Sequence, residues 1–352
     1  MRVIEAIAAQ AALHHQFFLG LQLMVSVEED KKTVYDWMFK LFRRQHEEKF
    51  LSSFEKLGLS KLPHAVACAQ YHVISNGIGG VDVECMIESD NKAWVRFRYP
   101  RWLYAGPAIC GVPIEASRGF LNGWYAYNGV SLGNPRLGFV CVSEDMTGQF
   151  GLCGYFKEYD RVLADHERLV FAPDEFVPAY NPADQLQPPV DRWGEERLAK
   201  AKRNYAMEYV RNALVCLGAV VGRERALELA LRVARLTGLQ HYQVMAQAVG
   251  ASDGGPPEAA QFLCAMMAGM GDDCQIQAQS EGEILVTQSG LRIVRGLNPS
   301  DRLDLLNTWI EIWRGAIHSH RTFMDISCDV GTQHLQWCIR LRRAGQPVVS
   351  GY

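Results

Sequence analysis

The chain has 352 residues, which is enough for two domains of ordinary size or one large domain. Apolar residues make up 48% and charged residues 21% of it, as is typical of a globular protein, and the net charge of −3 argues against a general nucleic-acid or polybasic membrane partner. The apolar N-terminal stretch is broken by polar residues, so we expect a buried helix there, with no signal peptide and no membrane span.

The first half predicts a helix followed by two hairpins. A helix-like segment covers 63–77, and alternating runs in 79–98 predict a hairpin with one buried and one wet face. An aromatic segment, 99–138, follows, and two further alternating runs lie in 137–156. Prolines at 178, 182, 188 and 189 then predict an extended linker.

The second half repeats this order. Helical spacing predicts helices in 197–222 and 223–238, and another helix-like segment covers 256–270. A hairpin in 269–288, an amphipathic helix in 298–320 and a hairpin in 322–341 complete it. Trp124 aligns with Trp309 and Cys153 with Cys338, so internal duplication is the better explanation.

The sequence therefore predicts an α+β fold made of tandem duplicated units. Each unit is an antiparallel sheet of about four strands, covered by helices on one face. The expected boundaries are 1–175 for the first unit, 176–195 for the linker and 196–345 for the second unit.

The ten cysteines are scattered, without a CxxC or CxxH pair. This pattern is typical of reduced, buried thiols and favours a cytoplasmic location. Zinc ribbons and redox dithiols need close pairs, so we expect no metal site.

The aromatic segment 99–138 is the first candidate for a ligand site. Long aromatic loops that carry glycines often line ligand pockets, although a rigid loop packed on the linker or on a dimer partner is an equal alternative. The residues assigned to substrate binding here are Trp102, Tyr104, Trp124, Tyr125, Tyr127 and Asn128. Arg96 could hold a substrate carboxylate, but Glu84 and Glu88 share its face and make cross-strand ion pairs the stronger interpretation.

The second candidate is the His-x-His pair, His318 and His320, at the predicted end of a helix. Two residues apart on a helix, these side chains diverge, so capping or surface roles are more common than a zinc site. The first half lacks both histidines, and we therefore assign them as candidate catalytic bases. No P-loop, GxSxG or HExxH motif is present, so we expect no nucleotide or other cofactor.

The segments "LGAVVGRERALELALRVARLTGLQHYQVMAQAVG", "DDCQIQAQSEGEILVTQ" and "DISCDVGTQHLQWCIRL" together resemble the L-2-amino-thiazoline-4-carboxylic acid hydrolase-like family, over about residues 200–342. Sensor modules of the 4-vinyl-reductase type share the terminal hairpin ending in a cysteine. The Cys-Pro often found after the first hairpin of those hydrolases is replaced here by "TQSGL" and "FRYPR", so the resemblance implies no particular catalytic residue.

The resemblance implies hydrolytic cleavage of a C–N bond in a small cyclic carboxylated compound. Such a reaction needs a base and donors for the developing oxyanion. A ligand-binding or sensor module without chemistry, and an assembly subunit, are the alternatives. The expected partner is a small-molecule substrate, with neither nucleic acid nor membrane, and a homodimer is left open.

Overall fold

The computed structural model describes residues 3–146, 151–185, 193–251, 253–280 and 282–342. The chain divides into two compact units. The N-terminal unit comprises Leu21–Arg223, and the C-terminal unit comprises the residues up to Gly20 together with those from Glu224 onward. This division follows spatial contact, whereas the predicted boundaries follow the order of the chain.

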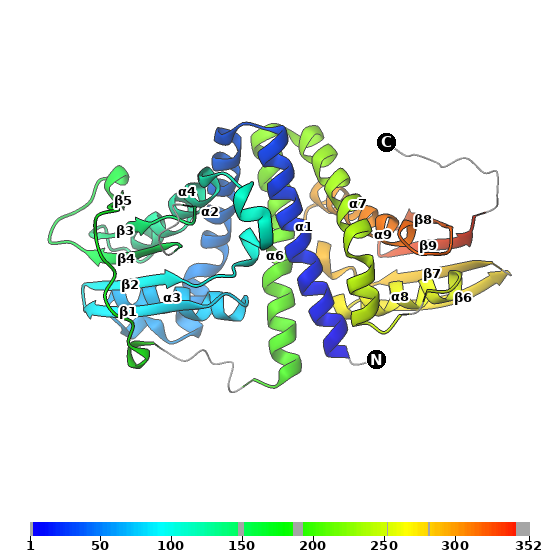
Figure 1. Cartoon of the computed structure of the whole chain (residues 1–352), viewed down its shortest axis with the longest axis horizontal. Coiled ribbons are helices and arrows are strands. Elements are labelled where there is room, and N and C mark those ends of the chain that lie inside the picture. Colours follow the sequence, from blue (N-terminus) through cyan, green and yellow to red (C-terminus); the bar gives the residue numbers. More distant parts are fainter. Residues whose placement is uncertain (1–2, 147–150, 186–192, 252, 281, 343–352) are drawn as a thin grey trace. The chain divides into compact units, whose positions relative to one another are not determined.

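The N-terminal unit contains a five-stranded sheet with strand order β1-β2-β4-β3-β5 (Figure 1). Neighbouring strands are antiparallel, except that β5 runs parallel to β3. Its strands are β1 (Val83–Ser89), β2 (Lys92–Phe97), β3 (Leu137–Ser143), β4 (Cys153–Glu158) and β5 (Leu169–Phe171). Its α-helices are α2 (Lys31–Lys56), α3 (His64–Ile78), α4 (Ile114–Gly123), α5 (Asn128–Ser131) and α6 (Glu195–Val221). Helix α3 contacts β1, β2 and β4.

The C-terminal unit contains a four-stranded antiparallel sheet with strand order β6-β7-β9-β8. Its strands are β6 (Asp273–Ser280), β7 (Glu283–Ser289), β8 (Met324–Val330) and β9 (His334–Leu341). Its helices are α7 (Arg223–Ala248), α8 (Pro256–Met270), α9 (Pro299–His318) and the first part of α1 (Val3–Glu28). Helix α8 contacts β6, β7 and β9, as α3 does in the other unit.

These two sheets confirm the α+β prediction. The first four strands of the N-terminal sheet, β1-β2-β4-β3, have the same relative order as β6-β7-β9-β8, which supports an internal duplication, but the duplication itself stays a prediction. Helix packing also supports the predicted duplication, because in each unit a pair of helices approaches closely at a glycine. A Cβ on Gly119 of α4 would lie 2.5 Å from the Tyr35 carbonyl oxygen of α2, and one on Gly238 of α7 would lie 1.9 Å from the Ile312 carbonyl oxygen of α9.

Both predicted hairpins show the alternation of buried and exposed residues along part of their strands. In β1, Val83 and Cys85 are buried, while Glu84 between them is partly exposed. In β7, Ile284, Val286 and Gln288 are buried, while Leu285 and Thr287 between them are partly exposed. In β3, by contrast, every residue is buried, so both faces of the N-terminal sheet are covered along this strand. The second face of this sheet packs against Ala172 and Val177, which follow β4 and β5 in the chain.

The predicted linker is partly bound to the N-terminal unit. Residues 182–184 form a 3₁₀ turn, the main-chain oxygen of Asp184 accepts a hydrogen bond from Gln70, and the Gln185 side chain accepts one from the Cys85 amide. The stretch 186–192, with the prolines at 188 and 189, lies outside the described residues.

Candidate functional site

The aromatic segment 99–138 folds into short helical pieces, namely η2 (Trp102–Tyr104), η3 (Gly106–Cys110), α4, η4 (Tyr125–Tyr127) and α5. Its predicted ligand residues take part in different contacts. Trp102 contacts Tyr205 and Tyr209 of α6. The Arg43 guanidinium carbon lies 3.5 Å from the ring centroid of Tyr127, so these two side chains form a cation–π contact.

Two aromatic residues at the start of η4, Trp124 just before it and Tyr125 within it, contact two histidines from α2 and α3. The His72 ring stacks on Tyr125 with centroids 4.1 Å apart, and the His46 ring meets Trp124 edge-on at 5.2 Å. Asn128 follows directly at the start of α5 and is fully buried. We call His46, His72, Trp124, Tyr125 and Asn128 the buried histidine cluster.

Several polar atoms of this cluster lack hydrogen-bond partners within the described part of the chain. They are His46 Nδ1, His72 Nε2, Trp124 Nε1 and the Tyr125 hydroxyl, whereas the Asn128 amide interacts with the Cys68 thiol. Buried polar groups are almost always paired, and each unpaired group costs about 1–3 kcal/mol. The concentration of such groups in one place is therefore the feature that distinguishes this region.

The buried histidine cluster is uncharged near neutral pH. Burial lowers the pKa of His72 well below its ordinary value, with a further contribution from His46. Burial and the charge of Arg43 lower the pKa of His46 to about 3. Burial also raises the pKa of Tyr125. The cluster can thus offer neutral donors and acceptors between aromatic rings, but no counter-charge for an ion.

Tyr104 belongs to a different arrangement, beside a buried ion pair that the sequence did not indicate. Asp145 accepts hydrogen bonds from Arg101, from the Tyr99 hydroxyl and from Ser117 Oγ, the last at 2.8 Å. The Arg101 guanidinium carbon lies 5.5 Å from the Tyr104 ring centroid. From sequence, Asp145 is an ordinary turn carboxylate, because no local signal reveals that three distant donors converge on it.

Arg96 does not point toward a free anion site. It forms an ion pair with Glu84 across the β1–β2 ladder, where the two residues are direct partners. Arg98 also approaches Glu84, at 3.6 Å. The cross-strand interpretation therefore describes Arg96 better than a substrate contact does.

The two candidate bases lie at the end of α9 in the C-terminal unit, and their surroundings differ. His318 is exposed, and its Nδ1 accepts a hydrogen bond from Arg235 at 2.8 Å. Partial burial, followed by the charge of Arg235, lowers the pKa of His318. His320 is buried, and its Nδ1 accepts the Thr322 amide at 3.2 Å. In neutral form each imidazole therefore carries its proton on Nε2, which leaves no free lone pair for a base.

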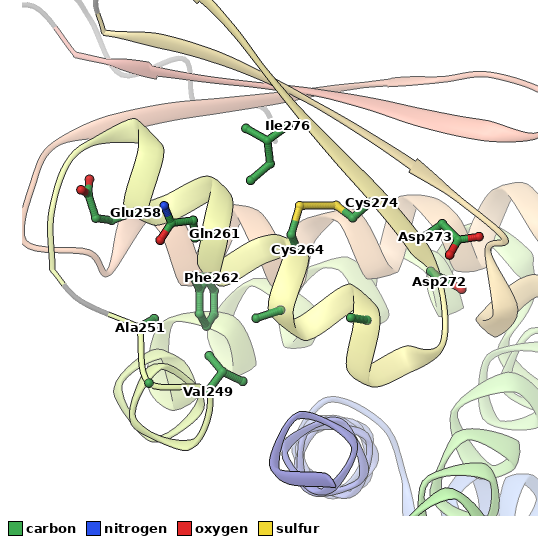
Figure 2. Close-up of a pocket in the computed structure, with 13 residues that line it drawn as sticks. Val249, Ala251, Glu258, Gln261, Phe262, Cys264, Asp272, Asp273, Cys274 and Ile276 are labelled. Atoms are coloured by element: carbon green, nitrogen blue, oxygen red, sulfur yellow. A yellow bond between two sulfur atoms is a disulfide. The ribbon is translucent and has the colours of Figure 1, made fainter. Parts of the chain in front are cut away.

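The C-terminal unit also holds a pocket of about 570 Å³ between the end of α7, α8 and β6 (Figure 2). A disulfide joins Cys264 and Cys274 at its wall. The prediction that the cysteines are all reduced was thus wrong for this pair. The turn between α8 and β6 brings together two thiols that lie ten residues apart, which no CxxC search detects.

The free cysteines among the described residues are Cys68, Cys85, Cys110, Cys141, Cys153, Cys216, Cys328 and Cys338. Within this same part of the chain, no group of three or more His, Cys, Asp or Glu side chains could hold a metal ion. No described helix is long and apolar enough to cross a membrane.

Comparison with known proteins adds no assignment. The sequence matches no protein-family model and no curated protein. The family suggested by the layout of the second half therefore remains a proposal.

Proposed function

We propose that the chain binds a small, uncharged organic molecule at the buried histidine cluster. The observation that carries this proposal is the group of unpaired polar atoms on His46, His72, Trp124 and Tyr125. A ligand that pairs with them would remove a desolvation cost that the unliganded protein bears.

The chemistry of the cluster favours a neutral heterocycle. The His72 ring stacks on Tyr125 and on Phe156. The Phe156 ring centroid is 5.5 Å away, and its plane is nearly parallel to that of His72, at 2°. Stacked rings favour a flat ligand, while the Trp124 indole N–H and the Asn128 amide can fix its orientation. An anion is disfavoured, because Arg96 is paired with Glu84 and the cluster itself carries no cation.

The proposal can be tested with the purified full chain and matched pairs of compounds. A panel of neutral five-membered cyclic amides and thiazolines is compared with the same rings bearing a carboxylate. We expect neutral members to raise the melting temperature and to give saturable heats in calorimetry, and their carboxylated counterparts to have no effect. Failure of every neutral ring in both assays would contradict the proposal.

Two substitutions connect binding with the cluster. Tyr125→Phe and His72→Phe keep the aromatic stack and remove one polar group each, so both should weaken binding by about tenfold or more. Trp102→Phe, which alters an aromatic side chain outside the cluster, is the matched control and should leave binding unchanged. Equal losses in all three variants would indicate a general packing effect.

Hydrolysis of a C–N bond in a small cyclic carboxylated compound is the second candidate. It is supported by one observation, namely that His72 Nε2 is unpaired beside the Tyr125 ring and could accept a proton. The strongly lowered pKa makes this imidazole a weak base, and for that reason we rank binding first. Turnover of the carboxylated rings, followed by NMR and lost in His72→Phe, would reverse the ranking.

The remaining sequence-based expectations are retained as parts of this proposal. They are membership of the thiazoline-carboxylate hydrolase-like family, the internal duplication, a cytoplasmic location and a homodimer. A sensor role of the 4-vinyl-reductase type would need only binding, and an assembly subunit would need neither binding nor chemistry.

A further inference from the structure

The disulfide between Cys264 and Cys274 opens onto the pocket of the C-terminal unit (Figure 2). Cys264 lies on α8 and Cys274 on the edge strand β6, with their Cα atoms 5.5 Å apart. Both residues are only partly buried, and both line the pocket of about 570 Å³. A molecule of several heavy atoms can therefore reach the sulfurs from the pocket side.

Other contacts already hold α8 against β6, so the disulfide is not the only link between these two elements. It closes a loop of ten residues, and helix α8 already contacts β6 directly. The Asp272 amide also donates a hydrogen bond to the Met267 carbonyl at 3.0 Å, which fixes the turn between them. Because stabilisation by a disulfide grows with the length of the closed loop, a short, accessible bond is the kind suited to exchange and not to structural support.

The described charged residues that line the pocket are all acidic. Among its described lining residues, Glu258, Asp272 and Asp273 are acidic and none is basic. Asp272 is buried and accepts hydrogen bonds from Gln288 and from the Arg292 amide, whereas Asp273, beside Cys274, is exposed. Glu258 accepts a hydrogen bond from the Gly255 amide. The exposed acidic side chains of the lining therefore favour cations over anions, while Arg292 and Arg295 act on the buried Asp272.

We propose that Cys264 and Cys274 form a redox site that exchanges with small, amine-bearing thiols bound in this pocket. The thiolate of the first small molecule attacks one cysteine sulfur, the protein S–S bond breaks, and the other cysteine leaves as a thiolate that takes up a proton. A second small thiolate then attacks the mixed disulfide. The products are the low-molecular-weight disulfide and the dithiol protein, so two electrons pass from two small thiols to the protein.

The test uses the oxidised full chain and three thiols of similar size, namely cysteamine, 2-mercaptoethanol and 2-mercaptoethanesulfonate. Acid quenching, alkylation and peptide mass spectrometry give the reduction rate of the Cys264–Cys274 bond alone. Each rate is divided by that measured with 2-hydroxyethyl disulfide, which cancels differences in thiol reactivity. We expect cysteamine to exceed the sulfonate by about three- to tenfold at low salt, with the preference collapsing at high salt.

Asp273→Asn is the matched variant, because it removes an exposed charge without changing size. It should reduce the cysteamine preference by about twofold, while Asp329→Asn, an exposed carboxylate on β8 outside the pocket, should not. Equal normalised rates for cysteamine and the sulfonate would contradict the proposed preference for amine-bearing thiols. Alkylation of both cysteines in air-oxidised protein without prior reduction would overturn the site itself. Cys264→Ser incubated with cystamine, the disulfide of cysteamine, should hold a mixed disulfide on Cys274 and release one cysteamine, and failure to form it would also contradict the exchange.

Discussion

The imidazole of His72 stacks on the phenol ring of Tyr125, with centroids 4.1 Å apart and the planes inclined by 17°. The two residues come from α3 and η4, over fifty positions apart in the chain. Both lie inside the N-terminal unit with a polar atom that no described residue pairs. The pair thus combines good ring packing with poor hydrogen bonding, a combination expected where a ligand binds and not where the core is built for stability alone.

The first prediction concerns the stability of the unliganded protein. Tyr125→Phe should leave the free energy of unfolding unchanged or raise it by up to about 1 kcal/mol, because it removes a buried hydroxyl that lacks a partner. Chemical denaturation of the ligand-free chain measures this. If an ordered water satisfies the hydroxyl, the substitution instead destabilises the protein by about 1 kcal/mol, and the case for a ligand at this atom weakens.

The second prediction concerns acid. His46 and His72 are neutral in the folded state below pH 6.5, because burial lowers the pKa of each, to about 3 for His46, whereas the unfolded chain takes up their protons near 6.5. The free energy of unfolding should therefore be unaffected by these two groups above pH 6.5. Below that pH it should fall, by roughly 1.4 kcal/mol per pH unit for each histidine, because only the unfolded chain takes up the proton. Denaturant melts between pH 7 and pH 4.5 should show this slope, reduced in His72→Phe. An identical slope in that variant would show that His72 is not buried as a neutral group.

The third prediction concerns the buried ion pair. Asp145→Asn should cost about 3–5 kcal/mol, because it leaves the Arg101 guanidinium buried without its counter-charge. The neighbouring Glu144→Gln is the matched control. Glu144 is also buried, but it pairs with Arg118, whose side chain is 44% exposed and keeps access to water, so this change should cost less than the loss of Asp145. Similar losses for both variants, measured by urea unfolding, would contradict the assigned role of Asp145.

The fourth prediction concerns the close approach of α7 and α9. Gly238→Ala places a methyl group 1.9 Å from the Ile312 carbonyl oxygen, so the helices must separate, and we expect a loss of at least about 2 kcal/mol. Gly194→Ala is the control, since a methyl group there meets nothing within 4 Å. A melting temperature for Gly238→Ala that equals the control's would mean that the two helices do not pack in this way.

The sequence by itself determined the kind and order of the elements. Alternation in 79–98 and 269–288 located the hairpins, and helical spacing in 197–238 located two helices, because both patterns depend on neighbours a few positions apart. It also singled out Trp124, Tyr125 and Asn128 as residues to examine, since long aromatic loops are seldom needed for connection alone.

Only the tertiary structure decided which of these side chains meet. It joined Tyr125 to His72 and Cys264 to Cys274, gave Asp145 its three donors, and covered the second face of the N-terminal sheet with residues after β4. It also separated His318 from His320 by exposing one and burying the other. The physical reason is that pattern is set by residues close in the chain, whereas pairing and burial depend on residues that are distant in sequence and meet only when the elements pack.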